Sequence, residues 1–426
     1  MDYQTKLLEA SKFKAWFVVV IASLFFFFEF GLTSVFNTLG HSIGAEYHIS
    51  MVHLGFINSL YFYTNILFLI PAGLLLDRFS TKTAIICALF FCCVGITAIS
   101  LSTSIYVLMV ARLMMGLAGS FSLISGIRVA TNYFRAEKLG FAIGVVIAIG
   151  MLGGYAVQEP LALVMEAYGW RHALLLVGTS GFVIMFLVAI FVRSAPKELR
   201  VLREAQCKSQ KESSFWVACK AVSTKSQNWY AALYIGLINV ATFMLGGAWA
   251  DAYLSHVYHG VSVVEASTVT GFLFLGMVVA YPFWGKLSEI LGRRKLPLIL
   301  GALVALIVVL LIMFVQGPIS WLAFLFFMLG FSTSAQTIAY PLIGEINSMK
   351  INSTAMALGS MMSLFWGGVL AQPLFPAMMK LFTYVFPNGS VSGQYQFAIS
   401  ILLVSFLMSL VFAFLTKETY CKRQVD

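Results

Sequence analysis

Two charged side chains inside long apolar stretches are the strongest chemical signal in this sequence. Glu29 lies within the apolar stretch 15–39, and Arg112 lies within 106–130. An ionisable side chain in a bilayer costs about 2.5–3.5 kcal/mol on insertion scales, so such a residue is a functional candidate. A carboxylate can bind and release a proton, and a guanidinium can hold an anionic group. We therefore expect a proton-binding site beside a fixed cation.

The depth of the two charges predicts that they lie near each other. At about 1.5 Å per residue, both lie roughly 20 Å from the same face of a bilayer core of about 30 Å. Thr33 and Asn37 follow Glu29 at i+4 and i+8, so one face of this helix is polar. We expect a Glu29–Arg112 pair in which Arg112 tunes the carboxyl or holds an anion. The alternative is a permanent structural ion pair.

Neutral polar side chains in the other apolar stretches could bind a small polar solute. Asn58, Tyr61 and Asn65 share one helical face, at i, i+3 and i+7. The alternative for each is an interhelical hydrogen bond that only holds the helices together. With the residues above, the candidate cavity set includes Asn58, Asn65, Gln158, Asn239, Gln336, Tyr340 and Gln372. Glu159 and Asp251 fall near the outer boundary, and we expect mouth or loop charges there.

Composition explains where these residues must be held. The chain has 426 residues, of which 60% are hydrophobic and 10% are charged. Soluble proteins carry about 25% charged residues, so this composition suits a protein whose outer surface faces lipid and not water. Polar or turn-rich breaks delimit twelve stretches of membrane-spanning length, which predict an all-α membrane protein. They are 15–39, 52–76, 83–103, 106–130, 140–164, 172–192, 229–254, 266–285, 297–316, 320–344, 353–379 and 395–416.

The distribution of Lys and Arg predicts the orientation. If both termini are cytoplasmic, the outer loops hold only Arg171 and Lys380, and nearly all other basic residues fall on the cytoplasmic side. The one long internal polar segment then lies in the cytoplasm. We predict an N-terminal half over 1–192, a linker over 193–228 and a C-terminal half over 229–426.

Other kinds of chemistry find little support in the sequence. The six cysteines have neither disulfide-framework nor metal-site spacing, so we expect no metal and no cofactor. The net charge of +10 is spread over loops without clustered aromatic residues, so we expect no nucleic acid partner. No nucleophile and base are paired in a motif, and we do not expect an enzyme.

An internal repeat organises the chain. Gly73-Leu-Leu-Leu-Asp77-Arg78 ends the second apolar stretch, and Gly285-Lys-Leu-Ser-Glu289 ends the eighth, 212 positions later. A second echo lies in the fifth and eleventh stretches, where Gly153-Gly154 and Gly367-Gly368 are 214 positions apart. We infer two related halves. The positions equivalent to Glu29 and Arg112 fall near Thr242 and Leu325, so only the first half carries central charge.

These motifs resemble the major facilitator superfamily of secondary transporters. The segment Gly285 to Lys295 is similar to the loop motif of that family, and Arg112-Leu-Met-Met-Gly116 to its fourth-helix arginine motif. The resemblance implies two pseudo-symmetric six-helix bundles that rock around a central site. It also implies a conformational latch, formed here by Gly73, Asp77, Arg78, Gly285, Glu289, Arg293 and Arg294.

The resemblance and the two central charges together suggest a function. We expect a monomeric carrier in the inner membrane of a bacterium, in contact with lipids, that takes up an amino acid or similar nutrient with protons. The first helix, with Glu29-Phe-Gly31, resembles nutrient carriers of intracellular bacteria. The alternatives are an exporter of a siderophore or drug, and a membrane sensor or scaffold that transports nothing.

Overall fold

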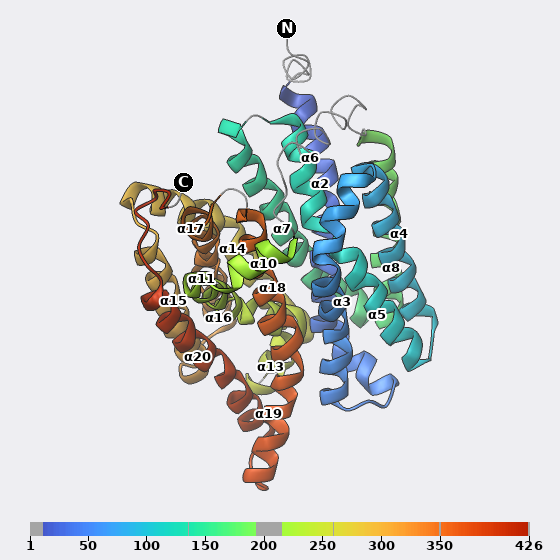
Figure 1. Ribbon diagram of the computed structural model, residues 1–426. Coiled ribbons are helices and arrows are strands. Elements are labelled where there is room, and N and C mark those ends of the chain that lie inside the picture. The colour runs from blue at the N-terminus through green and yellow to red at the C-terminus, as the bar shows by residue number, and fades with distance from the viewer. Residues whose placement is uncertain (1–11, 135, 193–214, 259, 349–350, 425–426) are drawn as a thin grey trace. The chain divides into compact units, whose positions relative to one another are not determined.

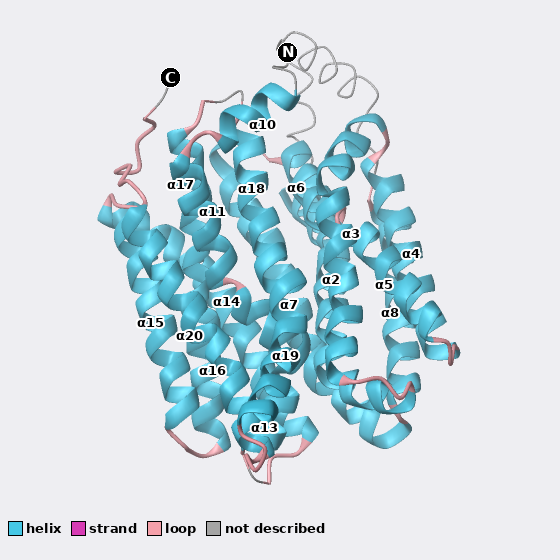
Figure 2. Cartoon of the chain, turned by 60° about the horizontal axis from the view of Figure 1, so that its bottom comes forward, coloured by secondary structure: helices cyan, strands magenta, loops and turns pink. Residues whose placement is uncertain are grey.

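The computed structural model describes residues 12–134, 136–192, 215–258, 260–348 and 351–424 (Figure 1). All regular secondary structure in these ranges is helical (Figure 2). Among the described residues, twelve helices or runs of helices are long and apolar enough to cross a membrane. They match the twelve predicted stretches one for one, which confirms the predicted all-α membrane fold. Helices suit this role because each satisfies its backbone hydrogen bonds within itself.

The chain divides into two compact units, Met1–Ile49 with Leu60–Val201, and Ser50–Ser59 with Leu202–Asp426. The helix α3 contributes its first turns to the second unit and the remainder to the first. The helices that build the first unit are α2 (Lys12–Glu46), α3 (Met51–Arg78), α4 (Thr81–Leu101), α5 (Ile105–Gly119), α6 (Ser122–Tyr133), α7 (Ala136–Tyr168) and α8 (Trp170–Phe191).

The second unit contains more interruptions within its spans. Its elements are α10 (Phe215–Ser223), α11 (Ser226–Ile238), α12 (Val240–Met244), η1 (Leu245–Trp249), α13 (Ala250–Val257), α14 (Val263–Leu291), α15 (Lys295–Phe314), α16 (Ile319–Thr333), η2 (Ser334–Ile338), α17 (Ala339–Ile346), α18 (Asn352–Leu364), η3 (Phe365–Leu370), α19 (Ala371–Val385) and α20 (Val391–Leu415). The elements η1 and η3 are π-helical and η2 is a 3₁₀-helix. Such segments change which backbone groups are paired and often mark functional positions.

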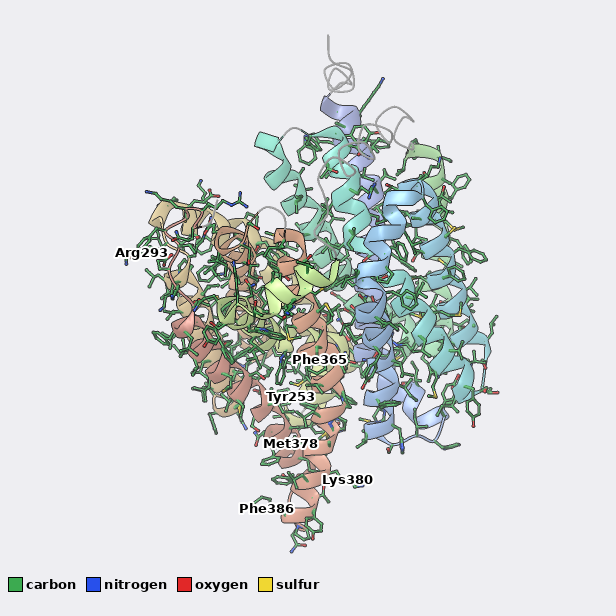
Figure 3. The ribbon with its side chains drawn as sticks, in the orientation of Figure 1. Tyr253, Arg293, Phe365, Met378, Lys380 and Phe386 are labelled. Atoms are coloured by element: carbon green, nitrogen blue, oxygen red, sulfur yellow. The ribbon has the colours of Figure 1, made fainter. Side chains whose placement is uncertain are left out.

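The predicted linker is only partly described. Residues 193–214 lie outside the described residues, and α10 together with the start of α11 occupies the remainder of 193–228. Figure 3 shows the two ends of the second unit: Arg293 lies at one end, and Lys380 of α19 and Phe386, which follows α19, lie at the opposite end.

In the first unit, α3 and α5 cross in close contact at a glycine. A Cβ on Gly116 would lie 2.0 Å from the backbone oxygen of Tyr61, so no other residue fits without moving one helix. Beside this contact, Thr64 Oγ1 donates to the backbone oxygen of Leu113 at 2.9 Å. Glycine thus lets the two backbones approach closely.

The second unit repeats this crossing between α14 and α16. A Cβ on Gly330 would lie 1.8 Å from the backbone oxygen of Leu273, and a Cβ on Gly276 would lie 2.1 Å from that of Phe327. Gly330 follows Gly116 by 214 positions, and Leu273 follows Tyr61 by 212. The crossing therefore aligns the two repeats residue by residue.

Candidate coupling site

Glu29 lies on α2 with 5% of its surface exposed. Its Oε2 accepts a hydrogen bond from Ser122 Oγ at 3.3 Å. Ser122 begins α6, where the fourth span bends after Gly119, and its hydroxyl also donates to the Gly119 backbone oxygen at 2.7 Å. The break between α5 and α6 thus brings a hydroxyl to the carboxylate. Sequence reasoning did not select Ser122, because serine in an apolar span is common.

Arg112 is fully buried on α5. Its guanidinium carbon lies 4.4 Å from the centroid of the Phe36 ring and 5.2 Å from that of the Tyr61 ring. Aromatic faces attract a cation, and the attraction grows when water is excluded. The two rings therefore help to hold the charge that the sequence places inside this span.

Tyr61 lies near both charged residues. Within the described residues, Glu29 takes its hydrogen bond from Ser122, and no ion pair joins Glu29 to Arg112, although the sequence predicted that pair. Its hydroxyl accepts a hydrogen bond from Asn65 Nδ2 at 3.2 Å. The position that a Cβ would take on Gly119 lies 2.3 Å from the Tyr61 hydroxyl and 3.0 Å from both Asn65 Nδ2 and Glu29 Oε1. The Tyr61 hydroxyl and Glu29 Oε1 are therefore at most about 5.3 Å apart. The missing side chain of Gly119 makes room for this cluster.

The same positions in the second unit hold a different set of side chains. At offsets of 212 to 214, Glu29, Tyr61, Asn65 and Arg112 correspond to Thr242, Leu273, Met277 and Phe326. All four counterparts are buried, and Thr242 Oγ1 contacts Met277 Sδ at 3.9 Å. The crossing places the counterpart of Arg112 at Phe326, one residue beyond the predicted Leu325. The fold thus builds this crossing once with charges and once without them.

The other predicted residues of α2 make local or interhelical hydrogen bonds. Thr33 Oγ1 donates to the backbone oxygen of Phe30 at 2.7 Å. Gln158 Oε1, on α7, accepts from Asn37 Nδ2 at 3.2 Å and from Thr38 Oγ1 at 3.0 Å. Asn37 and Gln158 therefore join α2 to α7, and Gln158 is fully buried.

Three of the predicted polar residues of the second unit lie among partners that the sequence did not indicate. Asn239 Nδ2 donates to Ser363 Oγ. Gln336 Nε2 donates to the Tyr281 hydroxyl at 3.2 Å, and the Tyr340 hydroxyl bonds to Ser360 Oγ at 3.4 Å. These bonds join η2 to α14, α17 to α18, and the residue that follows α11 to α18. The predicted Asn58 donates to the Gly247 backbone oxygen at 3.4 Å.

Gln372 ties two interrupted spans together. Its Nε2 donates to the Phe243 backbone oxygen at 3.0 Å, beside the π-helix η1. In return, Trp249 Nε1 donates to the Gln372 backbone oxygen at 2.9 Å. That oxygen needs a partner because Pro376, four residues later, has no N–H. The reciprocal bonds satisfy groups that the irregular helices leave open.

The prediction that Asp251 is a mouth or loop charge is wrong. Asp251 is 4% exposed and accepts hydrogen bonds from Ser267 Oγ and from Thr270 Oγ1, the latter at 2.7 Å. Counting residues gave its depth along the helix but not the cover that α14 provides. Glu159, by contrast, is exposed, as expected.

The comparison with known proteins settles the family. A sequence model described as the Major Facilitator Superfamily matches residues 19–259 and 231–424. This chain belongs to the Major Facilitator Superfamily. It is therefore an integral, multi-pass membrane protein and a secondary transporter, as the loop motifs suggested.

The names of the relatives of this transporter give different solutes. The chain is 24% identical over 325 residues to a probable galactarate/D-glucarate transporter of Bacillus subtilis, covering 68% of this chain and 70% of the relative. It is 25% identical over 261 residues to a probable sulfoacetate transporter of Cupriavidus necator, covering 59% and 60%. The second alignment thus spans less than two thirds of that relative.

Solved structures share the fold. A bacterial homologue of the human lysosomal transporter Spinster, in an inward-facing and unoccupied conformation, has a TM-score of 0.75 at 16% identity and covers 96% of this chain and 98% of that one. A D-xylose–proton symporter has a TM-score of 0.69 at 17% identity and covers 93% and 97%.

The loop motif of this transporter is only partly described in its first copy. Gly73 is half-buried near the end of α3, while the side chains of Asp77 and Arg78 lie outside the described ones. In the second copy, Gly285 has open space around it, and Glu289 and Arg293 are exposed. The structure pairs Arg294 with Glu345 of α17, at 2.7 Å between Nη2 and Oε1. Glu345 was not foreseen, because it falls at the end of a span.

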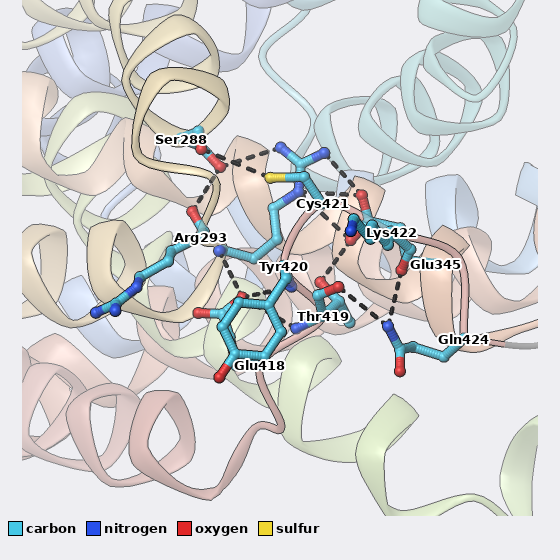
Figure 4. Close-up of polar contacts among 10 residues, drawn as sticks. Ser288, Arg293, Glu345, Glu418, Thr419, Tyr420, Cys421, Lys422 and Gln424 are labelled. Carbon is cyan, nitrogen blue, oxygen red and sulfur yellow. Dashed lines mark hydrogen bonds and ion pairs between the residues drawn. The ribbon is translucent and has the colours of Figure 1, made fainter.

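The C-terminal segment closes around this ion pair (Figure 4). Thr419 Oγ1 donates to Glu345 Oε2 at 2.5 Å, and the Gln424 backbone N–H donates to the Glu345 backbone oxygen at 2.8 Å. Glu418 accepts the first N–H groups of α15, from Arg294 at 2.8 Å and Lys295 at 2.9 Å. An anionic acceptor is favourable at a helix N-terminus.

The contacts of Glu418 lower the pKa of its carboxyl group. Burial raises its pKa, and hydrogen bonds from four backbone N–H groups outweigh burial, so the pKa lies below its ordinary value. The donors are the N–H groups of Arg294, Tyr420, Lys295 and Thr419. We name residues 416–424, with their contacts to Arg294 and Glu345, the C-terminal clamp.

Proposed function

We propose that this transporter takes up a small solute bearing a carboxylate or sulfonate group together with protons, by alternating access. Glu29 binds the coupling proton, and Arg112 attracts the anionic group of the solute. One observation carries the proposal: the helix crossing is built twice, and the positions of Glu29 and Arg112 in the first copy correspond to the neutral Thr242 and Phe326 in the second. Packing alone does not call for these charges, since Leu273, Met277 and Phe326 fill the second copy.

The chemistry of the cluster supports coupling. Protonation of Glu29 removes a negative charge from the neighbourhood of Arg112 and so favours an incoming anion. By linkage, a bound anion favours protonation of Glu29 to the same extent. Proton and solute then enter and leave together.

The comparisons support the solute class. Galactarate, glucarate and sulfoacetate, in the names of two relatives, are acids that are anionic at neutral pH. Amino acids also carry a carboxylate and belong to the proposed class. A symporter that moves protons with a sugar shares the fold.

The neutral polar residues complete the proposed cavity. We assign solute or helix contacts to Thr33, Asn37, Asn65 and Gln158 of the first unit and to Asn58, Asn239, Gln336, Tyr340 and Gln372 of the second. In our proposal, the loop motifs latch the inward or outward state through Gly73, Asp77, Arg78, Gly285, Glu289, Arg293 and Arg294. The protein acts as a monomer among lipids of a bacterial inner membrane, with both termini cytoplasmic.

Transport by the purified full chain in proteoliposomes tests the proposal. With an inward proton gradient, we expect accumulation of at least one probe among D-glucarate, sulfoacetate and a mixture of radiolabelled amino acids. Glu29→Gln should remove accumulation but retain exchange of internal for external solute, because a glutamine cannot release a proton. The matched control is Glu159→Gln, which changes an exposed carboxylate on α7 and should accumulate solute normally. Undiminished accumulation in Glu29→Gln would refute the role of Glu29.

The two alternatives predict different results in the same assay. An exporter of a siderophore or drug would move the solute in the direction opposite to the proton gradient. It would also lower accumulation of the solute in cells that express the gene. A sensor or scaffold would bind a probe without any exchange across the membrane.

A further inference from the structure

We infer that Tyr61 is the positioning residue that couples the proton site to the anion site, by moving its hydroxyl onto Glu29 when the carboxylate is ionised. This inference rests on the proposed roles of Glu29 and Arg112. Tyr61 is 1% exposed and lies on α3, between Glu29 of α2 and Arg112 of α5.

The hydroxyl of Tyr61 is ready to donate. It accepts a hydrogen bond from Asn65 Nδ2, and a phenol that accepts one bond keeps its own proton for another acceptor. Glu29 Oε1 lies at most about 5.3 Å from this oxygen, and both atoms pack against the Cα side of Gly119, where a Cβ would displace them. Within the described residues, the hydrogen bond to Glu29 comes from Ser122 and reaches the other oxygen, Oε2. Oε1 is therefore the natural acceptor for Tyr61.

The position of the Tyr61 ring depends on the position of the Arg112 guanidinium. Its face lies 5.2 Å from the guanidinium carbon, and the backbone of Tyr61 is fixed by the contact with Gly116. With the backbone fixed, a change in the position of Arg112 moves the ring and its hydroxyl rather than the helix. An anion that draws Arg112 away from the ring thus changes how well the hydroxyl can reach Glu29.

The internal repeat separates this role from packing. Leu273 occupies the equivalent position and makes the same backbone contact, with Gly330, so the crossing does not need a tyrosine. Gly119 corresponds to Thr333, a fully buried side chain. The space beside the hydroxyl is therefore specific to the first unit.

Other titratable groups lie on the helices that contact α2, and any test must distinguish their effects from that of Tyr61. α4 contributes Cys92, which interacts electrostatically with Glu29, and the neighbouring Cys93. α5 contributes Arg112, and α6 contributes Arg128, six residues after Ser122. α7 and α8 meet this part of α2 through Gly150, Gly153 and Gly181. The infrared C=O stretch of a protonated carboxyl distinguishes Glu29 from all of these groups.

We would record infrared difference spectra of the full chain in lipid bilayers over a pH series, without added solute. Glu29→Gln identifies the band. In Tyr61→Phe, the ionised carboxylate loses a donor, so protons should bind Glu29 about tenfold more tightly and the midpoint should rise by about one pH unit. Tyr63→Phe makes the same chemical change two residues away, at an exposed position, and should leave the midpoint unchanged.

A second variant guards against misfolding of the first. A Cβ on Gly119 would lie 2.3 Å from the Tyr61 hydroxyl, so Gly119→Ala should displace the hydroxyl and raise the midpoint in the same way. The same Cβ would also lie 3.0 Å from Glu29 Oε1, so Gly119→Ala can shift the midpoint directly. In the Tyr61→Phe background, the shift from Gly119→Ala should be smaller than in the parent, because the part that acts through the hydroxyl is already lost. An unchanged midpoint in the folded single variants, or additive shifts in the double variant, would overturn the role of Tyr61. If Glu29→Gln uncouples transport while Tyr61→Phe titrates like the parent, the proposed function stands and this inference alone fails.

Discussion

The two units solve the same packing problem with different side chains. In each, a glycine on the fourth membrane span meets the backbone of the second span: Gly116 against Tyr61, and Gly330 against Leu273. Around this crossing, the first unit places Glu29 and Arg112, and the second places only neutral residues. The two helices can therefore cross with or without charged side chains beside the glycine. The buried charges of the first unit cost free energy of folding and are not needed for the crossing.

The units also differ in the regularity of their helices. The second unit has π-helical turns at Leu245–Trp249 and Phe365–Leu370, held together by Gln372 and Trp249. The related residue of the first unit, Gln158, instead accepts two side-chain bonds from α2. The related glutamines thus bond to side chains in the first unit and to the backbone of an irregular span in the second.

The largest expected effect tests the shared scaffold. Gly116→Ala and Gly330→Ala should each destabilise the protein by about 3 kcal/mol, because the new Cβ would overlap a backbone oxygen. Gly144→Ala and Gly285→Ala, where nothing lies within 4 Å, serve as controls. Thermal melting and the yield of monodisperse protein measure the effect. If one unit tolerates its alanine, the two crossings are not equivalent.

The next effect tests the difference between the units. Arg112→Gln should weaken binding of an accepted anionic solute about a hundredfold, because it removes a buried charge from the site. Phe326→Leu, at the equivalent position, should lower stability by about 1 kcal/mol and leave binding unchanged. Isothermal titration and thermal melting separate the two results. Equal loss of binding in both variants would contradict the division of roles.

The smallest effect compares the two glutamines. Gln158→Leu should cost about 2 kcal/mol, since Asn37 and Thr38 each lose an acceptor. Gln372→Leu should cost about 1 kcal/mol, since a single donor to Phe243 is lost. Thermal melting measures both, with the exposed Gln316→Leu as the control. A reversed order would show that the irregular spans of the second unit depend more strongly on their side-chain tie.

The sequence predicts the helices well because hydropathy and length alone define a span. All twelve stretches are present, and the duplicated loop motifs identify the family before any comparison. Glu29 and Arg112 were found because a charge in an apolar stretch is conspicuous. These features depend on composition and spacing, which a single sequence displays directly.

The contacts were harder to predict because they depend on which helices meet. Asp251 was placed at the membrane surface, and the burial that α14 provides was not visible in its own helix. Arg294 was predicted to belong to the loop latch, and in the structure it forms an ion pair with Glu345 on α17. Ser122 and Gly119 carry no chemical signal by themselves. Their importance comes from the bend between α5 and α6, which brings them to Glu29.

The C-terminal clamp has a consequence for the order in which the chain becomes structured during synthesis. The N–H groups that open α15, at Arg294 and Lys295, find their acceptor in Glu418, more than a hundred residues later. Glu345 likewise receives Thr419 and Gln424 from the last residues described. A ribosome adds residues at about 5–20 per second, so this end of the second unit waits several seconds for its final contacts. This end of the second unit is therefore completed only after residues 416–424 have been synthesised.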